Sequence, residues 1–274
     1  MKRSDLHPGL ADLLRADPED LQAIGILADW LEEQGATDEA EWLQDNLHGM
    51  SGLFRGRTAP EPDLLGSIDP RWLGMRHGLI RTLKVPQGFD RHAERTCRVL
   101  SELPLALGLI GANVPDGPSA AAWMPPMAAN VPWLSTLSLA ADVDPGLLAG
   151  FQQLKTLRLT ALSFGWNERV WLPALDVLVL DVRSDDLSLL DTLAPAAVGR
   201  LELSSPSWAQ VSHTPLIDFL RRVPTRSIDL EGRSDFAFRK PLRDAGFEDD
   251  GEGLDDGDGS VRSWSAIEVG AVDE

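Results

Sequence analysis

A leucine phrase, Leu-x-x-Leu-x-Leu, recurs through the middle of the chain and limits the folds that the chain can adopt. Clear copies begin at Leu134, Leu154 and Leu175 and a weaker copy begins at Val198, so the starting points lie 20, 21 and 23 residues apart. A period of this length is typical of one structural unit that is stacked several times. Stacked units build extended binding surfaces more often than catalytic pockets, so the period favours a binding protein.

Each copy predicts a short strand followed by a return segment. Side chains alternate along a strand, so the two leucines of Leu-x-Leu lie on one face. One unit cannot cover that apolar face alone, and neighbouring units must stack in parallel to do so. We expect about seven such strands, from near Leu83 to near Leu230. The first unit is expected at Ile80 to Val85, and the second is centred on Leu105, Leu107 and Leu109.

The phrase resembles the leucine-rich repeat, in a degenerate form. The asparagine that usually follows the strand in that family is absent after Leu139, Leu159 and Leu180. The resemblance implies an α/β fold: a short solenoid over residues 76–247 with parallel strands on its concave face. Phe236, Phe238, Leu242 and Phe247 are expected to form a C-terminal cap, because the last repeat of a solenoid needs a cover.

The first 50 residues predict a small helical module. Asp17-Pro18 is a typical helix start, in which Asp17 caps the helix and Pro18 takes its first position. Apolar residues then recur at helical spacing as far as Leu31, and Gly35 ends the helix. A shorter helix is expected before this one, and another after Thr37. We expect Trp30 to pack between helices and the nearby acids to face solvent.

The N-terminal region contains the phrase Ala-Asp-Trp-Leu-Glu-Glu at residues 28–33, and the segments Arg15 to Asp20 and Ala40 to Leu43. On these residues, it resembles the bacterial repeat-companion domain. That short module is found at the N-termini of leucine-rich and other repeat proteins. Ala23 to Ile26 departs from the Arg-Leu-Val-Tyr run usual in the family, and Asp45 replaces a basic residue. The resemblance implies a shared helical fold and no catalytic residue.

The net charge of −18 lies at the two ends of the chain. Residues 1–50 hold twelve acidic and three basic residues, and residues 241–274 hold eleven and two, which leaves the middle neutral. Nucleic acid and anionic membranes are disfavoured as partners, because both require a basic surface.

Residues 51–75 are rich in Gly, Pro and Arg and are expected to form a linker. Residues 248–274 are expected to form an acidic flexible tail, although 261–269 are apolar enough to pair as a strand or to dock on a partner.

The candidate binding residues alternate with the buried positions of the expected strands. Small side chains dominate, the charge changes from basic to acidic along the repeats, and two valines form an apolar spot. The residues that we expect to contact a partner protein are Lys84, Ser138, Arg158, Val177, Val179, Glu202 and Asp229. A solvated face that binds nothing is the alternative for this surface. A structural or regulatory subunit that docks through its acidic termini is the alternative function.

Catalytic, metal-binding and cofactor-binding patterns are not found in the sequence. The five histidines are scattered, and no phosphate-binding loop or nucleophile elbow is present. Asp256, Asp258 and Ser260 have calcium-loop spacing, but Val261 and Ile267 stand at the positions that need Gly and Glu. We therefore expect no enzyme activity, no metal or cofactor, and no small-molecule substrate.

The single cysteine, Cys97, excludes an intrachain disulfide and is expected to be a buried thiol in a reducing compartment. The N-terminus lacks a signal-peptide pattern and no run is apolar enough to span a membrane, so a cytoplasmic scaffold is expected. The chain has nine tryptophans. Five tryptophans near the repeat connections are expected to fill the convex core, with partner anchoring as the alternative: Trp123, Trp133, Trp166, Trp171 and Trp208.

Overall fold

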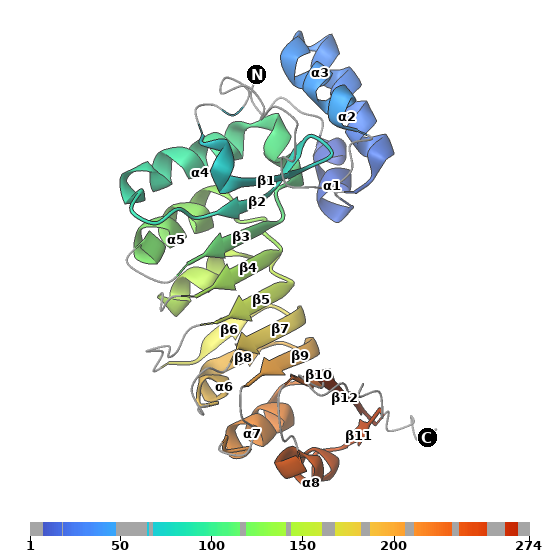
Figure 1. Cartoon of the computed structure of the whole chain (residues 1–274), viewed down its shortest axis with the longest axis vertical. Coiled ribbons are helices and arrows are strands. Elements are labelled where there is room, and N and C mark those ends of the chain that lie inside the picture. Colours follow the sequence, from blue (N-terminus) through green and yellow to red (C-terminus); the bar gives the residue numbers. More distant parts are fainter. Residues whose placement is uncertain are drawn as a thin grey trace. The chain divides into compact units, whose positions relative to one another are not determined.

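The computed structural model describes residues 8–17, 19–47, 65, 68–115, 119–140, 144–160, 168–181, 187–205, 211–231, 236–250 and 261–267. The fold is mixed α/β, and most neighbouring strands are parallel (Figure 1). The chain divides into two compact units, residues 1–134 (unit 1) and residues 135–274 (unit 2).

The first described elements of unit 1 are three helices, α1 (Pro8–Ala16), α2 (Leu21–Glu33) and α3 (Thr37–Asn46). The buried residues of α2, which include Ile24, Leu27 and Leu31, follow the predicted helical spacing. The cap of α2 is Asp20 rather than Asp17, because the Asp20 side chain accepts hydrogen bonds from the backbone N–H groups of Gln22 and Ala23. Thr37 is the first residue of α3 and Ala36 precedes it without a side-chain cap.

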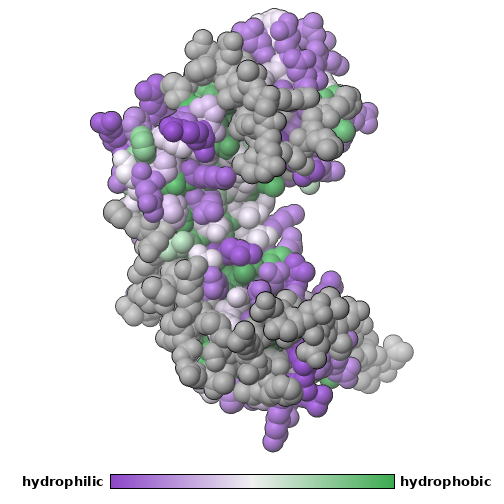
Figure 2. All heavy atoms as spheres, in the orientation of Figure 1, coloured by the Kyte–Doolittle hydropathy of each residue, from purple (hydrophilic) through white to green (hydrophobic). Residues whose placement is uncertain are grey.

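The acids that follow Ala28 face solvent, as predicted. Asp29, Glu32 and Glu33 are exposed, whereas Trp30 is half-buried. Figure 2 shows mostly hydrophilic residues in the region of α2 and α3 on the visible face. These carboxylates therefore form a solvated surface rather than an enclosed site.

In the rest of unit 1 the described residues form three strands, which pair in the order β1-β2-β3. Its elements are η2 (Pro70–Trp72), β1 (Leu73–Arg76), β2 (Leu79–Lys84), η3 (Asp90–His92), α4 (Ala93–Glu102), η4 (Pro104–Gly108), β3 (Gly111–Val114) and α5 (Ser119–Asn130). β1 runs antiparallel to β2, and β2 runs parallel to β3. The C-terminal end of the expected linker therefore belongs to this unit, because β1 begins within it.

The second expected strand was placed wrongly. Leu105 and Leu107 lie in the 3₁₀ helix η4, and the strand is β3, which begins at Gly111. Pro104 opens η4, and its fixed φ and missing N–H disfavour a strand at this point. Every residue of η4 is buried, so its leucines do not alternate between two faces.

The helical module is attached to the β1–β2 turn, within unit 1. The Trp42 indole Nε1 donates a hydrogen bond of 2.9 Å to the backbone oxygen of Gly78. The Glu19 carboxylate lies 2.8 Å from Arg76 Nε and 3.4 Å from a terminal nitrogen of Arg81. Burial lowers the pKa of the Arg81 guanidinium, and the charge of Glu19 opposes that shift. Polar contacts as well as packing therefore hold the module to the turn.

The described residues of unit 2 form nine strands. Its elements are β4 (Thr136–Leu139), η5 (Pro145–Gly150), β5 (Thr156–Leu159), β6 (Val170–Leu172), β7 (Leu175–Asp181), α6 (Leu189–Thr192), β8 (Leu193–Pro195), β9 (Val198–Ser204), α7 (Thr214–Arg222), β10 (Thr225–Glu231), α8 (Phe236–Asp244), β11 (Phe247–Asp249) and β12 (Val261–Ala266). Its main sheet has the order β4-β5-β7-β9-β10-β12-β11. The first five of these strands are parallel, and β6 and β8 form a separate parallel pair.

The leucines of the repeated phrase form two rows across the five parallel strands, and we call these the leucine rows. The first row is Leu137, Leu157, Leu178, Leu201 and Ile228. The second row is Leu139, Leu159, Leu180, Leu203 and Leu230. No member is more than 3% exposed. Full burial of such a side chain contributes about 1.5–3 kcal/mol, so the rows are a main source of stability in this unit.

The C-terminal end of unit 2 continues the sheet. Phe238, Leu242 and Phe247, which the sequence assigns to a cap, are buried, and their role as a cap stays a prediction. Within the expected tail, β12 pairs with β10, and its fully buried Trp264 extends the first leucine row beyond Ile228. This part of the tail is therefore a strand, because its apolar residues find a free sheet edge.

Several predictions fall outside the described residues. They include the calcium-like spacing at 256–260, most of the linker at 51–75, and Trp166 and Trp208. The boundaries of the helical module and of the repeat region stay predictions.

Candidate functional site: the open face of the unit 2 sheet

The residues between the leucines form the other face of the unit 2 sheet, because side chains alternate along each strand. One row on this face consists of Ser138, Arg158, Val179, Glu202 and Asp229. A second row consists of Thr136, Thr156, Val177, Arg200 and Ser227. We call the surface made by these two rows the open face. It brings together all the candidate binding residues of unit 2.

Lys84 is the one candidate residue that lies in unit 1. Lys84 is the last residue of β2, and it pairs in register with Asn113 of β3. Its side chain is exposed.

A shallow depression of about 300 Å³ lies on the open face. Arg158, Val179, Glu202 and Asp229 line it, together with Asp181, Ser204 and Glu231 at the ends of their strands. Asp181 and Ser204 pair in register, as do Ser204 and Glu231, so these residues form a third row beside the first. The candidate set chosen from the sequence leaves them out, although the same alternation places them on this face.

The acidic residues of the open face are partly neutralised. Arg200 Nε lies 2.9 Å from Glu202 Oε1 and 3.8 Å from Asp229 Oδ2. The Arg200 side chain is 51% exposed, and an ion pair so accessible to water contributes at most about 1 kcal/mol. The expected change from basic to acidic is therefore interrupted by this arginine, which the candidate set also omits.

The expected apolar spot is smaller than the sequence suggests. Val179 is only 6% exposed and Val177 is half-buried. Val179 stands on an inner strand between Arg158 and Glu202, and long side chains on neighbouring strands cover a shorter one. The open face is therefore mainly polar and charged.

Outside the open face, the described residues include one thiol, that of Cys97. Cys97 is buried in α4, where burial, with a smaller effect of Glu94, raises the pKa of its thiol to about 12. Its sulfur is therefore protonated at neutral pH, and the expectation of a buried thiol is confirmed. No group of three or more His, Cys, Asp or Glu side chains in the described part of the chain could hold a metal ion. None of the described helices combines the length and apolar character needed to cross a membrane.

Comparisons with protein-family models, with curated proteins and with solved structures find no match to the chain.

Proposed function

We propose that this chain is a non-catalytic protein-interaction module, whose repeats form a short, degenerate leucine-rich-repeat solenoid. The leucine rows carry this proposal, because residues 20 to 23 positions apart in the sequence occupy equivalent, buried positions on parallel strands. The N-terminal helices serve as a repeat-companion module. The single buried thiol suits a reducing cytoplasm.

The partner protein binds the open face. A parallel sheet held by ten buried side chains offers a rigid surface, which lowers the entropy lost on binding. Its depression carries Arg158 beside the carboxylates of Asp181, Glu202, Asp229 and Glu231. A partner with basic groups facing the carboxylates and an acidic group facing Arg158 would be complementary to it.

Affinity capture from lysate of the source cells tests this assignment. Arg158→Glu reverses the one exposed cation of the depression, and we expect it to weaken partner binding by about tenfold or more. Arg226→Glu makes the same charge change at an exposed position of β10 outside the open face and is the matched control. Retention of every partner by the Arg158→Glu variant would overturn the assignment.

Docking through the acidic termini is the second candidate function, favoured by the exposed carboxylates of α2. Its test is the double change Glu32→Lys and Glu33→Lys, which leaves the buried face of α2 intact. Loss of the partner in this variant, with binding retained in Arg158→Glu, would favour the acidic termini. At the other end, a truncation should begin after Ile267, because a longer one removes β12 from the sheet.

A further inference from the structure

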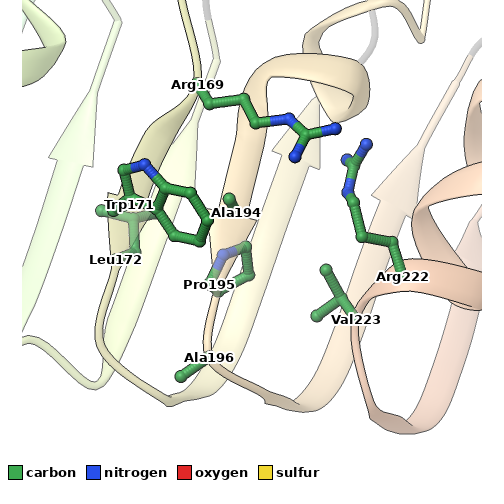
Figure 3. A pocket seen from close by; sticks show the side chains of 8 residues that line it. All are labelled: Arg169, Trp171, Leu172, Ala194, Pro195, Ala196, Arg222 and Val223. Carbon is green, nitrogen blue, oxygen red and sulfur yellow. The ribbon is translucent and has the colours of Figure 1, made fainter.

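A second hollow, of about 210 Å³, lies beside the β6–β8 pair of unit 2 (Figure 3). Its lining includes Ala194 and Pro195 of β8, Val223 after α7, Trp171 of β6, and two arginines, Arg169 and Arg222. None of the open-face residues takes part in it. We call it the Trp171 hollow.

Trp171 is 71% exposed at the side of this hollow. Its strand neighbours Val170 and Leu172 are buried, so the alternation along β6 turns the indole outward. The expectation that this tryptophan fills the core is therefore wrong. Among the described residues it is the most exposed large apolar side chain. Exposed tryptophan beside a concave surface is typical of the anchor positions of protein interfaces.

Two guanidinium groups border the same hollow. A terminal nitrogen of Arg222 donates a hydrogen bond of 2.6 Å to the backbone oxygen of Leu190 and one of 3.1 Å to that of Leu193. These two bonds fix the position of the Arg222 guanidinium. Arg169 is exposed, and Figure 3 shows its side chain extending toward that of Arg222. Within the described ranges, no carboxylate forms an ion pair with either arginine. Two like charges that converge in this way favour an anion between them.

The volume of the hollow limits what can occupy it. Pockets for small molecules usually measure about 300–1,000 Å³, which is more than this hollow provides. One side chain of a larger partner fits better. Nucleic acid is disfavoured because the chain carries a net charge of −18.

We propose that the Trp171 hollow is a second docking site, which binds a segment of a partner protein that places an aromatic side chain beside an acidic residue. The aromatic ring packs on the Trp171 indole, and the carboxylate lies between Arg169 and Arg222. This site is separate from the open face, and the proposal stands whether or not the open face binds a partner.

Fluorine NMR of the full-length protein labelled with 5-fluorotryptophan tests the proposal, with the Trp171 signal assigned from Trp171→Phe. The probe is the peptide N-acetyl-Glu-Phe-Asp-amide. We expect it to shift the Trp171 signal saturably, and we expect N-acetyl-Gln-Phe-Asn-amide to bind about fivefold more weakly or worse, because it lacks the charges. Absence of a saturable shift, or equal binding of the two peptides, would show that the hollow does not recognise an acidic segment.

Arg169→Glu provides the residue-level test, because the Arg169 side chain is exposed and its replacement leaves the buried residues unchanged. We expect this variant to lose the shift, and Arg226→Glu, with the same charge change elsewhere, to keep it. Arg158→Glu should also keep it, which separates this site from the open face. An unchanged titration in Arg169→Glu, or an equal shift produced by inorganic phosphate alone, would overturn the proposal.

Discussion

Replacement of Leu178 by alanine is expected to lower the free energy of unfolding by about 2–5 kcal/mol. Leu178 is fully buried at the centre of the first leucine row, between Leu157 and Leu201. The smaller side chain leaves a cavity that neighbours on rigid strands fill only in part. Urea denaturation followed by circular dichroism measures the loss.

Val177→Ala is the matched control for this change. Val177 precedes Leu178 on β7, but it is half-buried on the open face. Val177→Ala is expected to lower the free energy of unfolding by about 1 kcal/mol or less. Equal losses at the two positions would contradict the assignment of one buried and one accessible face to the sheet.

Gly78→Ala is expected to destabilise unit 1 by about 2–5 kcal/mol, because two costs add at this position. Gly78 has φ of 77°, a left-handed conformation that strains a residue with a Cβ atom. An added Cβ would also lie 2.9 Å from Leu43 Cδ2 and 3.2 Å from Leu43 Cα. Leu43 is fully buried in α3, so α3 would have to move away from the turn.

Gly35→Ala separates the two costs. Gly35 has the same φ of 77°, but nothing lies within 4 Å of an added Cβ. We expect Gly35→Ala to lower the free energy of unfolding by the conformational cost alone, about 1–2 kcal/mol. Urea denaturation of the two variants, followed by tryptophan fluorescence, makes the comparison. If Gly35→Ala is as destabilising as Gly78→Ala, then α3 is not packed against the turn as described.

The sequence predicts those features that depend on local periodicity. Leucine spacing places β4, β5, β7, β9 and β10 correctly, and helical spacing places α2, because each pattern repeats over enough residues to specify a face. The alternation along the same strands also predicts the open face. The leucine spacing fails where a proline precedes it. Pro104 begins the 3₁₀ helix η4 at the point where Leu105 and Leu107 suggest a strand.

Features that depend on pairing between distant residues are not predictable in this way. The burial of Val179 depends on which side chains flank it on β5 and β9, and the neutralisation of Glu202 depends on Arg200. The outward direction of Trp171 requires knowledge that β6 pairs with β8 outside the main sheet. The apolar composition of residues 261–269 allows a strand, but the partner of that strand, β10, is known only from the structure.

Site-specific photo-crosslinking in the source cells tests the central claim, that the open face of unit 2 binds a partner protein. A photoreactive p-benzoylphenylalanine replaces Thr156, which lies on the open face beside Val177. The same group in place of Glu94, an exposed residue of α4 that belongs to neither proposed binding site, is the control. If the claim is right, position 156 gives a discrete crosslinked species and position 94 gives none. Absence of a crosslink at position 156, or equal crosslinking at both positions, would contradict it.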